Sequence, residues 1–239
     1  MDRLAWFPAD QRGEHVQQEP KSARTRAKLK SAAFKLFRSK GFSNTTLRAI
    51  ATESGVSLGS TYYYFESKDD LALELFDDLL AEHRARVAPD LATGNTLEHN
   101  LRSLWDGLLD TLEPYHDCGT AFLRAGGLPP PDENGALVAA IDSSRPRAPL
   151  PVRQGLPELV HLITRAILAF WAADTSPDRN RSRLLVARAA PLTARIAVLS
   201  RLPVVRTILD EILALVRALG SEDDARSRRV RGAAGGHAA

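Results

Sequence analysis

The sequence is poor in the residues that would cross-link it or anchor it in a membrane. Among its 239 residues it has one cysteine, Cys118, which excludes an internal disulfide. No stretch of about 18 residues is free of charge or strong polarity. The first 20 residues lack the basic start and apolar run of a secretory signal. We therefore expect a cytoplasmic protein with no membrane partner.

The sequence is not rich in glycine or proline, and it lacks the residue alternation typical of β-strands. The 15 Gly and 14 Pro are too few for a collagen-like or wholly disordered chain, and 44% hydrophobic residues are ordinary for a globular protein. We find no convincing alternation of apolar and polar residues, which would indicate β-strands, whereas apolar residues recur at helical spacing along much of the chain. The sequence predicts an all-α fold of roughly nine helices.

Acidic residues are nearly absent from one segment. Between Lys21 and Phe65 there are nine Lys or Arg against one acid, Glu53, which gives that segment a net charge of +8 when the whole chain carries +3. A solvated helix face would explain a basic run that has no motif. Such an asymmetry also indicates a module that faces a polyanion such as DNA.

Apolar stripes and their end signals set the expected helices. In the basic segment we expect one helix that ends at Lys40–Gly41, a short helix that ends at Gly55, and a third from Ser57 to about Tyr64. A fourth follows from Ser67–Lys68 to before Pro89. Downstream we expect helices over Leu97–Leu112, Ala136–Ile141, Leu156–Ala173, Asp178–Arg201 with a kink at Pro191, and Val204–Leu219. Residues 113–154 otherwise break the helical rhythm.

Two short helices joined at Gly55 give a helix-turn-helix. Ala51 is small enough for close helix contact, Gly55 permits the turn, and the helix that opens at Ser57 would present its first residues to a DNA major groove. The pattern alone is moderately specific, and its place inside the basic segment supports it.

The order and spacing of residues 24–76 resemble the N-terminal DNA-binding domain of the TetR family of transcriptional regulators. The resemblance rests on Ala32-Ala33, Phe37, Gly41-Phe42, Thr45-Thr46, Ile50-Ala51, Gly55-Val56-Ser57, Gly59, Tyr62, Phe65, Lys68 and Leu71. It implies an all-helical homodimer whose N-terminal three-helix domain binds a palindromic operator and whose C-terminal helical domain binds a small molecule and dimerises. The corresponding units are a flexible arm (1–20), the helix-turn-helix domain (21–67), the ligand-binding and dimerisation domain (68–220) and a disordered tail (221–239).

Carried over by position, the resemblance assigns DNA contacts. Thr45 or Thr46 and Tyr62 would contact phosphate, and Lys68 would hold phosphate from the start of the fourth helix. Residues at or near base edges would be Ser57, Leu58, Gly59, Ser60, Thr61 and Tyr63. Hydroxyl, amide and ammonium groups suit phosphate, and Gly59 lets the backbone approach the bases. Packing between helices would explain Tyr62 equally well.

The C-terminal half suggests a pocket and an interface. An apolar cavity could be lined by Trp105, Tyr115, Phe122, Phe170 and Trp171, with Tyr115 or His161 as polar handles, although aromatic residues at this spacing also suit a plain core. The dimer would form through an apolar stripe of Val205, Ile208, Leu209, Ile212 and Val216. Arg181, Arg188 and Arg195 recur every seven residues and suit a solvated or dimer-rim face.

Three other readings compete. Gly55-Val56-Ser57-Leu58-Gly59 matches the nucleophile elbow of α/β-hydrolases, but that motif needs a strand before its Ser, and a helix is expected here. His116, Asp117 and Cys118 are consecutive and cannot easily converge on one metal ion. We therefore expect no enzyme, cofactor or metal.

The second function candidate is a DNA-binding dimer without a small-molecule ligand, constitutive or controlled by a protein partner.

Overall fold

The chain folds into helices throughout the part that the structure describes. This computed structural model describes residues 21–91, 94–124, 128–131, 133–147 and 150–199, together with 207, 208, 211 and 214, and the side chains of 150–154 are left out. Within these residues there are nine α-helices, two 3₁₀-helices and no strand. The predicted all-α class is confirmed.

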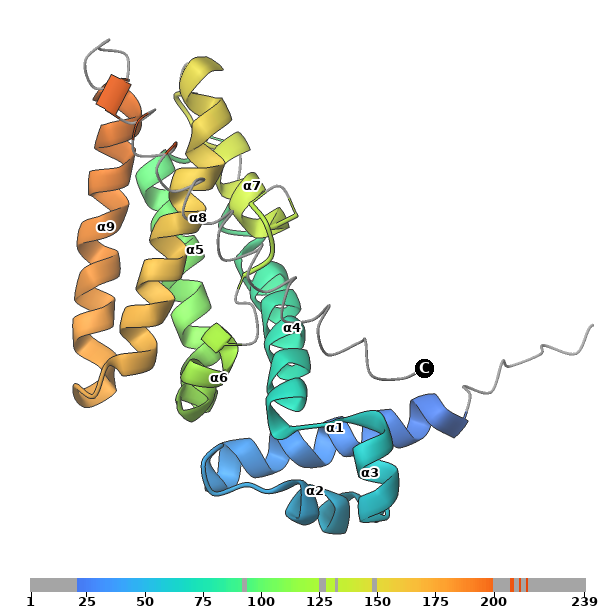
Figure 1. Ribbon diagram of the computed structural model, residues 1–239. Coiled ribbons are helices and arrows are strands. Elements are labelled where there is room, and N and C mark those ends of the chain that lie inside the picture. Colours follow the sequence, from blue (N-terminus) through green and yellow to red (C-terminus); the bar gives the residue numbers. More distant parts are fainter. Residues whose placement is uncertain are drawn as a thin grey trace, which may run out of the picture.

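One long and two short helices form one end of the molecule. They are α1 (Lys21–Lys40), α2 (Leu47–Ser54) and α3 (Leu58–Tyr64), and the long α4 (Lys68–Val87) leads away from them. Figure 1 shows α1 lying across the end of α4, with α2 and α3 beneath it. The expected stripe of α1 is buried as predicted, and it packs with Ile50, Phe65 and Leu71 of the neighbouring segments.

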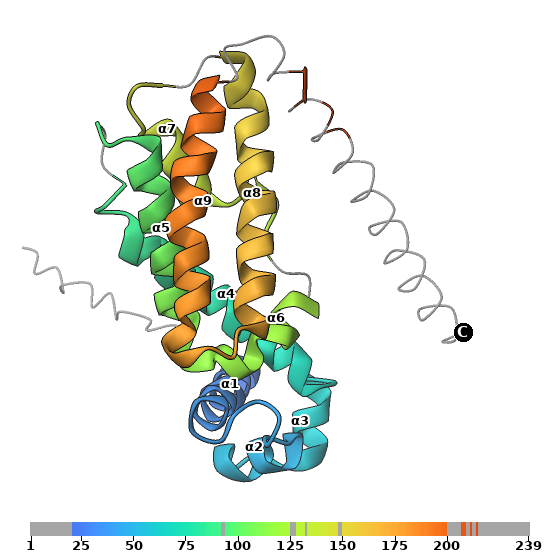
Figure 2. The same ribbon diagram turned by 90° about the vertical axis from the view of Figure 1, so that its left-hand side faces the viewer.

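The other end is a helical bundle built around three long helices. These are α5 (Leu97–Leu112), α8 (Leu150–Ala173) and α9 (Asn180–Leu199), which run side by side in Figures 1 and 2. Shorter elements fill the gaps between them: η1 (Glu113–Cys118), α6 (Gly119–Arg124), α7 (Gly135–Asp142) and η2 (Pro177–Arg179). Because α4 packs against both α1 and α5, it connects the two ends.

Some boundaries differ from the prediction. Residues 113–124, expected to break the rhythm, form η1 and α6. Helix α8 begins at Leu150 rather than Leu156 and continues through Pro157, while α9 continues through Pro191. Of the final helix expected over Val204–Leu219, the structure describes only residues 207, 208, 211 and 214.

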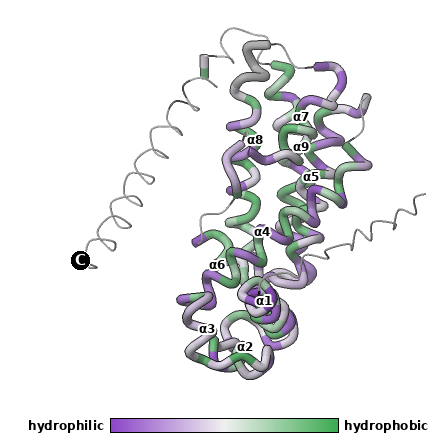
Figure 3. The backbone as a smooth tube through the Cα atoms, turned by 90° about the vertical axis from the view of Figure 1, so that its right-hand side faces the viewer, coloured by the Kyte–Doolittle hydropathy of each residue, from purple (hydrophilic) through white to green (hydrophobic). Residues whose placement is uncertain are grey.

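One helix of the bundle is unusually apolar. By length and composition alone, Gly155–Ala173 could cross a membrane. In the structure this segment of α8 packs against α6, α7 and α9, as a helix of a protein core does. Hydrophobic and hydrophilic residues alternate along most of the other helices (Figure 3), which is typical of amphipathic packing.

Candidate DNA-binding surface

Side-chain caps and one left-handed residue fix the turn between α2 and α3. The Thr46 hydroxyl accepts a hydrogen bond from the Ala49 amide at 3.2 Å and starts α2. Gly55 ends α2 with φ of 69°, a conformation that residues with a Cβ rarely adopt. The Ser57 hydroxyl then accepts from the Ser60 amide at 3.1 Å and starts α3. These local bonds set where α3 begins.

Ion pairs hold the helix-turn-helix to the rest of the molecule. Glu74 of α4 pairs with Arg26 and with Lys30, the latter at 3.2 Å, and Lys35 pairs with Glu53 of α2 at 2.5 Å. The Lys35 ammonium lowers the pKa of the Glu53 carboxyl by hydrogen bonding and by charge. Three of the nine cations in the basic segment are therefore already paired within the protein.

The outer face of α3 exposes most of the residues predicted to contact DNA. Tyr63 is 83% exposed and Tyr62 54% exposed, which is unusual for large aromatic side chains and leaves both without a place in the core. Gly59 and Ser60 are exposed too, and a Cβ at Gly59 would meet nothing within 4 Å. Another molecule can therefore approach the backbone of α3 closely.

The residues that begin the two helices complete this face. Thr46 and Ser57 are exposed at the N-termini of α2 and α3, and Leu58 is half-buried. Amide groups at helix N-termini favour phosphate oxygens, but both hydroxyls are already used as caps. Their contribution to a phosphate contact would come through these positioned amides.

Two of the predicted contacts face inward. Thr45 is 1% exposed and Thr61 is fully buried. Each hydroxyl donates to the carbonyl of the residue four positions earlier, Thr45 to Gly41 at 2.8 Å and Thr61 to Ser57 at 3.0 Å. The burial of Thr45 and Thr61 speaks against a direct DNA contact by either hydroxyl, whereas Thr46 is exposed, and all three contacts stay predictions.

Lys68 is also committed within the protein. Its Nζ donates to the carbonyls of Phe42 at 2.8 Å, Thr45 at 3.2 Å and Ser43 at 3.5 Å, and it lies 4.3 Å from the centre of the Phe42 ring. An ammonium group has three N–H donors, and these carbonyls take all three. In this structure the Lys68 side chain holds the α1–α2 loop, and its phosphate contact stays a prediction.

Arg48 is a further candidate for a DNA contact that the sequence did not single out. It lies exposed on α2, one residue after the first residue of that helix, and no ion pair engages it among the described residues. Its place in the basic segment was visible in the sequence, but no motif position distinguished it from the other cations. A free guanidinium beside Thr46 suits a phosphate contact.

The geometry at Ser57 does not fit a hydrolase. Helix α2 precedes it, the described residues contain no strand, and its hydroxyl is bonded to the Ser60 amide and, at 2.8 Å, to the Ser60 hydroxyl. A nucleophile elbow needs a strand, a sharp turn and an exposed, activated Ser. Here Ser57 is the N-cap of a helix.

The large aromatic residues predicted to line a ligand pocket form a closed core. Trp105, Trp171 and Phe122 are buried. The Trp105 indole donates to the Thr164 hydroxyl at 2.9 Å, and the Phe122 ring stacks on Phe76 with centroids 4.8 Å apart. The cavity beside them is about 10 Å³, too small to hold more than one water. In this structure these residues are core.

The remaining three predicted pocket residues do not join them. Phe170 is 43% exposed, so it does not line an inner pocket. His161 is half-buried, its Nδ1 has no hydrogen-bond partner among the described residues, and burial lowers its pKa. Tyr115 is half-buried in η1, where burial raises its pKa. The six residues therefore do not enclose one ligand-sized space.

The predicted dimer stripe lies almost wholly outside the described residues. Of its members the structure describes Ile208, which is half-exposed, whereas Val205, Leu209, Ile212 and Val216 lie outside. Its role stays a prediction. The described helices contribute other exposed apolar residues, Phe170 on α8 and Leu184 and Leu192 on α9.

Comparison with known proteins finds a family match over the segment that contains α2 and α3. Residues 29–75 match the sequence model of "Bacterial regulatory proteins, tetR family". The "HTH-type transcriptional repressor KstR2" of Rhodococcus jostii (strain RHA1) is 39% identical over 77 residues, which are 30% of this chain and 38% of that protein. The KstR2 of Mycobacterium tuberculosis (strain CDC 1551 / Oshkosh) is 34% identical over 120 residues, 48% of this chain and 51% of that protein.

The fold comparison extends further along the chain. A solved "TetR transcriptional regulator from Rhodococcus sp. RHA1" aligns with a TM-score of 0.51 at 15% identity, covering 72% of this chain and 97% of the other. This likeness shows a shared fold. The sequence matches span about half or less of the curated relatives' length, and the family model matches the segment that contains the helix-turn-helix. The match over residues 29–75 and these relatives support the assignment of this chain to the TetR family of bacterial regulatory proteins.

Proposed function

We propose that this protein is a cytoplasmic transcriptional repressor that binds a palindromic DNA operator as a homodimer and is released by a small molecule. The observation that carries the proposal is the exposed face of α3, where Tyr62 and Tyr63 project beside Gly59 and Ser60. Exposed aromatic and small polar residues on a capped helix of a basic segment suit a major groove. Both relatives are named as transcriptional repressors, which supports repression rather than activation.

Affinity for operator DNA tests this proposal. Replacing Tyr63 with Ala should weaken binding at least about fivefold, because one lost base contact costs roughly 1–3 kcal/mol. Fluorescence anisotropy with a labelled operator at fixed salt measures the change. Thr175→Ala is the matched control, since Thr175 is exposed in the α8–α9 connection, far from α3 in the fold. Equal affinities for both variants would count against α3 as the reading helix.

The homodimer is supported by apolar residues left exposed on α8 and α9. Leu184 and Leu192 are each 58% exposed, and Phe170 lies on the adjacent helix. Leucines spaced by two turns of one helix suit a helix-to-helix interface between two copies. Leu192→Glu should produce monomers in sedimentation velocity, whereas Lys28→Glu, exposed on α1 and away from this face, should not. A dimeric Leu192→Glu variant would place the interface elsewhere.

The closed core favours a second candidate for regulation. A cavity of about 10 Å³ beside Trp171 cannot admit an inducer unless the core opens. The alternative is a DNA-binding dimer without a small-molecule ligand. A release assay on the operator-bound protein with a metabolite library distinguishes them, since an inducer must bind the free dimer more tightly than the DNA-bound one.

A further inference from the structure

A cavity lies at the end of the bundle away from the DNA-binding helices. Its volume is about 510 Å³, which falls within the range of small-molecule sites. Three segments distant in sequence line it: the start of α5, residues 145–147 after α7, and the last turns of α9. None of these residues was among the predicted pocket residues.

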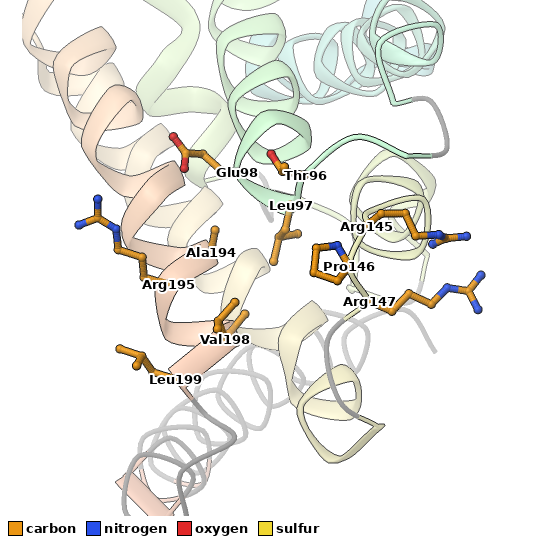
Figure 4. Close-up of a pocket in the computed structure, with 11 residues that line it drawn as sticks. Thr96, Leu97, Glu98, Arg145, Pro146, Arg147, Ala194, Arg195, Val198 and Leu199 are labelled. Atoms are coloured by element: carbon orange, nitrogen blue, oxygen red, sulfur yellow. The ribbon is translucent and has the colours of Figure 1, made fainter.

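The interior of this cavity is apolar. Figure 4 shows Leu97, Pro146 and Val198 facing a common space from the three segments. Ala194 and Ala197 provide the α9 wall on the inner side, and their small side chains leave room there. A ligand that fills the space therefore needs an apolar body.

The rim of the cavity is positively charged. Arg195 extends outward on the α9 side, and Arg145 and Arg147 extend outward on the opposite side (Figure 4). Glu98 is the one acid among the lining residues. Hydrogen bonds from the Arg145 guanidinium to the carbonyls of Ser144 at 2.8 Å and Asp142 at 3.4 Å hold it in place. Three cations against one anion favour a negatively charged head group at the opening.

We propose that this cavity binds an amphiphilic anion, with its apolar chain between Leu97, Pro146 and Val198 and its carboxylate at the arginine rim. The site is separate from the core aromatic residues and from α3, so binding does not depend on the proposed repressor activity. An apolar interior alone would accept a hydrocarbon of any charge, and the rim adds the preference for anions.

Calorimetric titration of the full-length protein without DNA tests the site. The probes are dodecanoate, dodecanol and dodecyltrimethylammonium below their micellar concentrations. We expect dodecanoate to bind more tightly than the other two. Val198→Trp should weaken dodecanoate binding at least about tenfold because the indole fills the space. The melting temperature of this variant without ligand checks its folding, since Val198 is half-exposed and tolerates a larger side chain.

A charge variant tests the rim. Replacing both Arg147 and Arg195 with Ala should weaken dodecanoate binding about three- to fivefold and leave dodecanol unchanged, because exposed charge pairs contribute little each. Arg181→Ala, on α9 but outside the cavity, should have no effect. The proposal is overturned if full-length protein fails to bind dodecanoate. Binding that survives Val198→Trp would also overturn it.

Discussion

Substitution of Lys68 can distinguish a structural role of this residue from a contact with DNA. Its ammonium donates to the carbonyls of Phe42 and Thr45 at 2.8 and 3.2 Å and lies over the Phe42 ring. Hydrogen bonds of charged groups contribute about 1.5–3 kcal/mol each, and the half-exposed setting lets water replace part of this. We expect Lys68→Met to lower the free energy of unfolding by about 2–3 kcal/mol.

Two assays on the same variants measure this. For a chain of this size, each kcal/mol shifts the melting temperature by about 2–4 °C, so Lys68→Met should melt roughly 4–12 °C below the unmodified protein. The salt dependence of operator binding, measured where the variant is folded, should keep its slope because no phosphate contact is lost.

Arg48→Met is the matched comparison and should behave in the opposite way. Because Arg48 is exposed and unpaired among the described residues, its loss should leave the melting temperature unchanged. Its proposed phosphate contact should disappear, which reduces the salt slope by about 0.9 per half-site. If Lys68→Met instead melts normally and loses the salt slope, the structural role of Lys68 is wrong.

Two further predictions concern the C-terminal bundle. Burial alone would raise the pKa of the Asp174 carboxyl, but hydrogen bonds from Ser182 and Ser176 lower it below its ordinary value. The bonds stabilise the fold fully above the unfolded pKa of about 4, and this stabilisation is lost progressively as the pH falls from there through the lower folded-state pKa. Asp174→Asn should therefore unfold about 2–4 kcal/mol more easily at pH 7, and this difference should begin to shrink only as the pH falls below about 4, as measured by urea denaturation. Phe122→Ala should cost about 3–5 kcal/mol because Phe122 is core, whereas Phe170→Ala should cost under about 1 kcal/mol, and equal losses would contradict their different burial.

Periodicity predicted the parts of the fold whose helices carry a regular apolar stripe. Leu29, Leu36 and Phe37 of α1 are buried as their spacing indicated, and α4 begins and ends where its cap and Pro89 placed it. Residues 113–124 could not be predicted in this way, because a 3₁₀ segment and a helix of six residues are too short to show a period.

Residue type alone could not separate exposed from buried hydroxyls at the DNA-binding surface. Thr45 and Thr46 are adjacent and chemically identical, yet one bonds inside the fold and the other caps α2. A signal was present for Thr61, which lies one helical turn before the buried Phe65 and therefore on the same face of α3. The role of Lys68 depends on the path of the α1–α2 loop, which no local pattern encodes.

Selection of bound sequences from random duplex DNA by the full-length protein tests the central claim most directly. The account predicts enrichment of a near palindrome, with half-sites about 34–36 Å apart along the helix, because two copies of α3 must reach successive major grooves. The selected site should bind at least about a thousandfold more tightly than random duplex at physiological salt. No enrichment, or equal affinity for selected and random DNA at that salt, would contradict it.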